Sequence, residues 1–71
     1  MKYSMVLTWS AEDGAYLVYL PEWEELAAQP VADGATYEEA ARRGGEALDT
    51  LIEVAKERGQ ALPQPQIVAN A

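Results

Sequence analysis

The sequence predicts an α+β fold in which a three-stranded antiparallel sheet packs on one long helix. Two patterns predict it. Apolar residues alternate with a period of two through the first 20 positions, with one turn between them. They then recur with the helical period between positions 37 and 58. The chain has 71 residues, so a single small domain over 1–71 is expected, in the order β-β-β-α with a fourth short strand as an optional last element.

A β-hairpin is predicted over 2–10 and 15–20. Asp13-Gly14 is a strong turn signal between the two strands, because glycine adopts positive φ without steric cost. Pro21 cannot donate to a sheet ladder and should end the second strand. The first strand has large apolar side chains at every second position: Tyr3, Met5, Leu7 and Trp9.

The second strand has two apolar faces. Alternation places Tyr16, Val18 and Leu20 on one face, which we expect to be the core. Leu17 and Tyr19 then lie on the other face. One helix cannot cover both faces of a sheet, so Leu17 and Tyr19 are predicted to form an interface.

A weaker pattern predicts a third, irregular strand over 25–32, with Pro30 marking an edge or a bulge. Its apolar positions are Leu26, Ala28 and Val31. Asp33-Gly34 should close it with a second turn.

A helix over 37–58 follows. Thr36 and Glu39 have the spacing of a capping box, and Gly59 is placed to end the helix. Glu38 with Arg42, and Glu39 with Arg43, are spaced for ion pairs one turn apart. One apolar stripe runs along the helix: Tyr37, Ala40, Ala41, Gly44, Ala47, Leu48, Leu51, Ile52 and Ala55.

Gly44 and Gly45 interrupt the helix. Gly44 lies on the apolar stripe, where close approach to the sheet would explain it, whereas the pattern gives no reason for Gly45. Beyond the helix, the proline-restricted segment after Gly59 is expected to be extended, with residues 66–69 forming either the fourth short strand or a frayed tail.

The composition of the chain limits the classes of function that it can have. The net charge is −7, and with 5 Lys and Arg against 12 acids the chain lacks the clustered cations that direct nucleic-acid binding requires. Neither a membrane span nor a signal-peptide core is visible, so a cytoplasmic protein is expected. Without cysteine, disulfides cannot stabilise so small a domain. A homodimer or larger homo-oligomer is therefore expected.

Catalysis is not expected. There is no histidine to activate a serine or threonine. The acids before the helix could in principle bind Mg²⁺ for a metal-dependent nuclease. They lie mostly on turns and loops, however, so no catalytic residue, metal ligand or cofactor is assigned, and this nuclease remains the second alternative.

The stretch "AEDGAYLVYLPEWEE" places aromatic side chains beside acidic ones. Aromatic anchors contribute affinity when a partner desolvates them, and acidic neighbours speed encounter with a basic partner. Trp23 fits equally well as a lid of the core. We predict a partner or oligomer interface made of Leu17, Tyr19, Trp23, Glu22, Glu24 and Glu25.

The chain resembles the HicB-like antitoxin family. The resemblance is carried by "KYSMVLTWSAEDGAYLVYLPE", "ADGATYEEAARRGGEALDTLIE" and "GQALPQP", which together cover residues 2–65. The family usually has Pro-Asp-x-Pro-Gly-Cys after the hairpin. Here that stretch begins at Pro21 and reads "PEWEEL", which leaves the register of the third strand open.

The resemblance implies a partial RNase H-like fold without that fold's catalytic acids. It also implies an antitoxin that binds a HicA-like toxin, a small basic RNA-cleaving protein. Many family members carry a C-terminal DNA-binding domain, and we expect a short member without one. The first alternative is an orphan self-associating regulatory or structural module.

Overall fold

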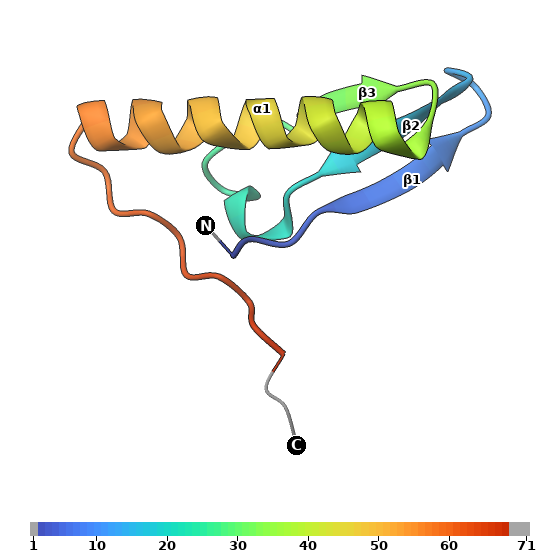
Figure 1. Ribbon diagram of the computed structural model, residues 1–71. Coiled ribbons are helices and arrows are strands. Elements are labelled where there is room, and N and C mark those ends of the chain that lie inside the picture. Colours follow the sequence, from blue (N-terminus) through green and yellow to red (C-terminus); the bar gives the residue numbers. More distant parts are fainter. Residues whose placement is uncertain (1, 69–71) are drawn as a thin grey trace.

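The computed structural model describes residues 2–68 as a three-stranded antiparallel sheet with one long helix on one side (Figure 1). The order is β1 (Val6–Ser10), β2 (Ala15–Tyr19), the short 3-10 helix η1 (Pro21–Trp23), β3 (Ala32–Gly34) and α1 (Tyr37–Glu57). The strands lie in the order β1-β2-β3, so β1 and β3 are the two edges. The predicted α+β class is confirmed.

The hairpin turn forms as predicted. The N–H of Gly14 donates to the carbonyl oxygen of Ser10 over 2.8 Å, and Gly14 adopts φ +62°. The Ser10 hydroxyl also donates to the Asp13 carboxylate over 3.0 Å. β1 begins at Val6 rather than at residue 2. Val6 pairs with Tyr19, the last residue of β2, so the residues before Val6 lie opposite Pro21 and have no strand to pair with.

The third strand was predicted in the wrong place. It covers Ala32–Gly34 and not 25–32. The N–H groups of Leu26 and Ala27 both donate to the carbonyl oxygen of Trp23, each over 3.0 Å, so the chain turns there instead of extending. The predicted strand over 66–69 is absent at 66–68, and its last residue lies outside the described residues.

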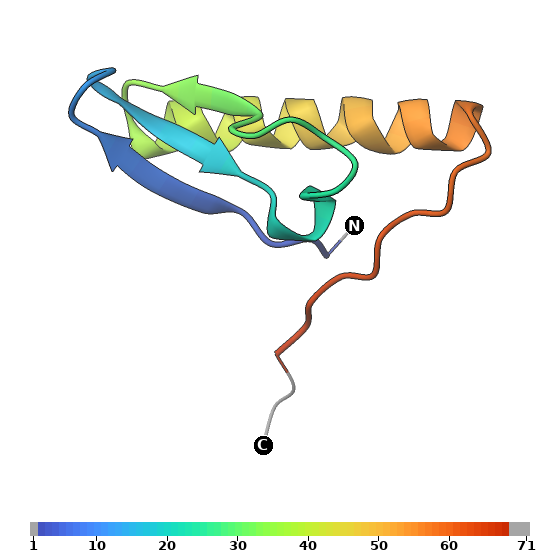
Figure 2. The same cartoon turned by 180° about the vertical axis from the view of Figure 1, so that it is seen from behind.

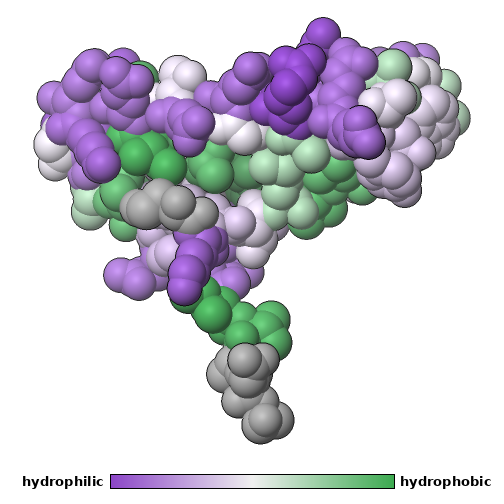
Figure 3. All heavy atoms as spheres, in the orientation of Figure 1, coloured by the Kyte–Doolittle hydropathy of each residue, from purple (hydrophilic) through white to green (hydrophobic). Residues whose placement is uncertain are grey.

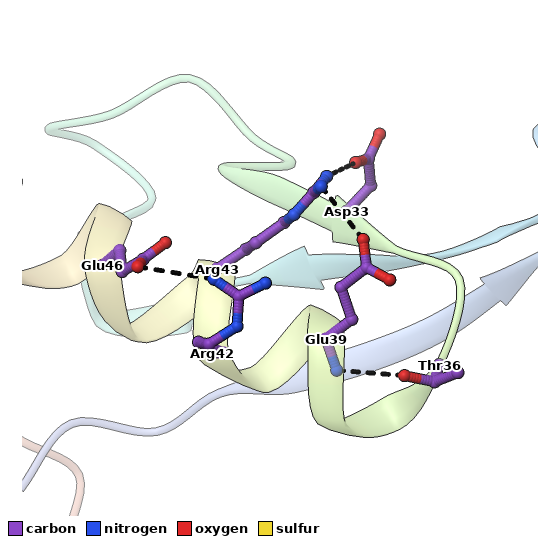
Figure 4. A network of polar contacts seen from close by, with 6 residues as sticks. All are labelled: Asp33, Thr36, Glu39, Arg42, Arg43 and Glu46. Atoms are coloured by element: carbon purple, nitrogen blue, oxygen red, sulfur yellow. Dashed lines mark hydrogen bonds and ion pairs between the residues drawn. The ribbon is translucent and has the colours of Figure 1, made fainter.

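The helix begins where the capping pattern predicts. The Thr36 hydroxyl oxygen accepts the N–H of Glu39 over 3.1 Å. The Glu39 carboxylate does not complete a capping box but pairs with Arg43 over 3.0 Å, and Arg43 also reaches Asp33 over 3.4 Å (Figure 4). At the other end, Gly59 ends the helix with φ +65°.

The predicted ion pair between Glu38 and Arg42 is wrong. Arg42 pairs with Glu46, one turn later in the helix, over 3.5 Å (Figure 4), and not with Glu38. Both partners are exposed, so either pairing contributes only a few tenths of a kcal/mol.

The core lies between the sheet and α1. Its largest fully buried side chains are Trp23, Leu20 and Val18. The predicted inner face is thus confirmed at Val18 and Leu20, whereas Tyr16 is half-buried. The Tyr16 ring instead stacks on Tyr37, with 4.2 Å between ring centroids, at the end of the sheet where the helix begins.

Candidate partner-binding surface

The strand register divides the sheet into two faces. Side chains of directly paired residues point to the same side of a sheet. Leu7 pairs with Val18, and Val18 with Ala32, so this set faces α1. The other set forms what we call the outer face: Val6, Thr8, Leu17, Tyr19 and Asp33. Figure 2 shows this side of the sheet in front of α1, and no helix or strand of residues 2–68 covers it.

The outer face is apolar toward the end of β2. Val6 is 44% exposed, and its pairing partner Tyr19 is half-buried. Leu17 is half-buried beside Thr8. The predicted placement of Leu17 and Tyr19 opposite the core is therefore confirmed, and Val6 joins them.

A hollow of about 370 Å³ adjoins Tyr19 at this end of the sheet. Gln29 fixes one wall, because its side-chain amide accepts the N–H of Leu20 over 2.9 Å and donates to the Leu20 carbonyl oxygen over 2.8 Å. Both backbone groups of Leu20 are thus satisfied where the strand has ended. The hollow is lined by Val6, Tyr19, Leu20, Pro21, Glu24 and Gln29.

Trp23 is not part of the exposed outer face. It is 1% exposed and packs in the core with Leu20 and Ala55. Its ring meets that of Tyr3 edge to face, with 5.4 Å between centroids. η1 turns the tryptophan inward, which the spacing of residues in the sequence could not indicate. Of the two interpretations of Trp23, the lid of the core is the correct one.

Glu22 is also not a free member of an acidic border. Its carboxylate accepts the N–H of Ser4 over 3.0 Å and the N–H of Gln66 over 3.0 Å. The carboxylate therefore joins three segments that are distant in the sequence. The Tyr3 hydroxyl donates to the Pro63 carbonyl oxygen over 2.7 Å close by, and this second bond holds the segment after the helix against the N-terminal segment.

The electrostatics of Glu22 agree with this structural role. Desolvation raises the pKa of its carboxyl, but the hydrogen bonds that it accepts, foremost those from the backbone N–H groups of Gln66 and Ser4, outweigh desolvation. The net result is a pKa below the usual value for glutamate. The ionised form is thus the one that the fold stabilises.

Glu24 and Glu25 remain as the exposed acidic border. Both follow η1 and are exposed, and Glu24 lines the hollow beside Tyr19. Leu26, the next residue, is exposed as well. The surface that the structure brings together therefore consists of Val6, Leu17, Tyr19, Gln29 and Glu24. Glu25 lines a second hollow, which Leu62 and Gln64 of the segment after the helix also line.

The acidic residues of the described part of the chain are spread over separate elements. Within residues 2–68 no three acidic side chains come together to hold a metal ion. Glu12 and Asp13 lie in the hairpin turn, while Glu24 and Glu25 follow η1 beyond the other end of β2. The five residues of β2 separate the two groups by about 17 Å.

Sequence reasoning missed Val6 and Gln29. Val6 carried a weak signal, since it is an apolar residue between the alternating positions of the first strand. Gln29 carried none, because its role depends on a turn that brings it back to Leu20.

Comparison with protein-family models, curated proteins and solved structures yields no match to this chain. Along residues 2–68, no helix combines the length and the apolar character needed to cross a membrane.

Proposed function

We propose that the outer face binds a small basic protein, and that the chain is an antitoxin-type module that sequesters a HicA-like, RNA-cleaving toxin. The observation that carries the proposal is the apolar patch of Val6, Leu17 and Tyr19, which no element of residues 2–68 covers and which Glu24 borders. The toxin itself is inferred from the resemblance to the HicB-like family.

The patch has the composition of a binding site. Tyrosine is enriched among residues that dominate binding energy, and a hollow beside it can receive a side chain of the partner. Gln29 and Pro21 give this hollow firm walls, so little conformational entropy is lost on binding.

Charge favours a basic partner. The chain carries a net charge of −7, and Glu24 places negative charge next to the patch, with the exposed Glu25 following it in the chain. A protein that binds RNA needs a cationic surface. An acidic module that occupies this surface would prevent RNA from binding there, which is the physical basis of neutralisation in this proposal.

We propose no catalytic role for the acids. The acidic groups at the two ends of β2 lie too far apart to act on one substrate atom, and Glu22 is committed to the backbone of Ser4 and Gln66. The nuclease alternative therefore gains no support from the geometry.

Affinity capture from lysate of the native host tests the proposal, with the Tyr19→Ala variant as the matched control. The chain should retain a small basic protein that the variant releases. That protein, once purified, should cleave RNA, and added chain should stop the cleavage. A captured protein without RNA-cleaving activity would contradict the proposal that the partner is a toxin. Equal capture by the variant would contradict the proposal that the outer face binds it.

A further inference from the structure

The free edge of β1 lacks the features that keep sheet edges from pairing. An edge strand presents unpaired N–H and C=O groups, and natural monomers guard it with a charge, a proline, a short strand or a covering segment. β1 is an edge strand with the uncharged sequence "VLTWS" and contains no proline.

The opposite edge is guarded. β3 has three residues, and it contains the charged Asp33 and the glycine Gly34. Arg43 reaches from α1 to the Asp33 carboxylate over 3.4 Å and so places an ion pair at this edge (Figure 4). Within residues 2–68, the sheet thus has a protected edge at β3 and an unprotected edge at β1.

The side of β1 that faces the helix is also incompletely covered. α1 lies mainly against β3 and β2 and contacts β1 least. Trp9 is consequently 51% exposed although it lies on the inner side of the sheet, and Leu7 is half-buried. Figure 3 shows a hydrophobic band beneath the hydrophilic surface of the helix, on the side where β1 lies in Figure 1.

We propose that β1 pairs antiparallel with β1 of a second copy of this chain, about a two-fold axis at Thr8. This register uses all five residues of β1 and keeps the helix-facing sides of both sheets together. Leu7 then lies opposite Trp9 of the second copy. Leu7 and Trp9 of one copy then pack against Trp9 and Leu7 of the other, in the space between the two helices.

Charge supports the antiparallel direction. Lys2 is the single cationic residue among positions 1–35. Antiparallel pairing brings it alongside the hairpin turn of the second copy, which carries Glu12 and Asp13. Parallel pairing would instead bring Lys2 against its own copy. The strand itself is uncharged, so the contact avoids most of the repulsion between two acidic chains.

The small size of the core favours dimerisation, because a dimer buries further apolar surface. Only Trp23, Leu20 and Val18 among the large side chains of residues 2–68 are fully buried. Domains of this size commonly gain stability by oligomerisation. Pairing uses the backbone groups at the edge of β1, whereas the proposed toxin contacts the side chains of Val6, Leu17 and Tyr19, so the two proposals rest on different observations.

Sedimentation equilibrium of the full chain tests the proposal. The unchanged chain should sediment at twice 7.8 kDa. Thr8 is exposed and would face its own copy, so Thr8→Lys and Thr8→Glu should each halve the mass, and an equimolar mixture of the two should restore it. Ala41→Lys, an exposed change on the helix, should leave the dimer intact.

A Thr8→Cys variant provides a second readout, because a disulfide traps even a weakly associated dimer. The chain has no cysteine of its own, so oxidation can link only two copies. Thr8→Cys should form a covalent dimer rapidly, because directly opposed residues bring their Cβ atoms within reach of a disulfide. Ala41→Cys should not. A monomeric unchanged chain, a dimer that persists in Thr8→Lys, or equal cross-linking at both positions would overturn the proposal.

Discussion

Gly44 of α1 lies directly against Val18 of β2. A Cβ atom built on Gly44 would be 2.7 Å from Cγ1 of Val18 and 3.0 Å from Sδ of Met5. Gly45, its neighbour, has open space around the same position. The two glycines thus have different physical roles, although they are adjacent in one helix.

Alanine at these two positions should change stability in opposite directions. Gly44→Ala should lower the free energy of unfolding by about 0.5–2 kcal/mol, because overpacking against Val18 costs more than alanine contributes as the better helix former. Gly45→Ala should raise it by about 0.5–1 kcal/mol, because alanine is the better helix former and meets no neighbour. Urea unfolding at neutral pH measures both. Shifts of the same sign would mean that the helix does not pack on β2 at Gly44.

Thr36→Ala should destabilise the protein by about 1 kcal/mol, because the N–H of Glu39 loses its acceptor at the start of the helix. Thr50→Ala is the matched control. Thr50 is an exposed residue in the helix whose hydroxyl donates to the Glu46 carbonyl oxygen, and its removal should change stability by less than about 0.5 kcal/mol. Urea midpoints that move equally in both variants would show that the cap does not form.

Glu22 should make stability depend on pH in the acidic range. Its pKa is lowered in the folded chain, so its contribution is complete above the unfolded pKa of about 4.3 and is lost as the pH falls through the folded value. Glu22→Gln keeps the shape but cannot ionise. The stability difference between the two chains should be constant near neutral pH and shrink on acidification, as thermal unfolding across pH would show. A difference that is independent of pH would contradict the role assigned to the carboxylate.

Reversing Glu24 and Glu25 to lysine should slow association with the basic partner and flatten its dependence on salt, because exposed charges act mainly on encounter. Folding should be nearly unchanged. Adding Glu22→Lys to the pair should in contrast destabilise the fold, since the amides of Ser4 and Gln66 lose their acceptor. Stopped-flow association at two salt concentrations measures the first effect. Unchanged association rates would contradict the proposal that Glu24 and Glu25 speed encounter with the partner.

The sequence was sufficient where local rules decide the outcome. Thr36 bounds the helix through its side-chain hydroxyl, Gly59 bounds it through its positive φ, and Asp13-Gly14 forms the turn. It was insufficient between Pro21 and Ala32, where the burial of Trp23 bends the chain and displaces the third strand.

The candidate surface shows the same division. Alternation placed Leu17 and Tyr19 on the face away from the helix, because strand periodicity is local. It could not indicate that Glu22 binds the amides of Ser4 and Gln66, since this contact joins segments 18 and 44 residues away in the sequence.

The dissociation rate of the captured basic protein tests the central claim, that the outer face is the binding surface, most directly. Tyr37→Ala is the matched control, because this tyrosine is 62% exposed and lies on the helix, away from the outer face. Tyr19→Ala should speed dissociation by about thirtyfold, the factor that corresponds to a loss of about 2 kcal/mol at a binding hot spot. Tyr37→Ala should leave the rate unchanged. Equal dissociation from Tyr19→Ala and the unchanged chain would contradict the account.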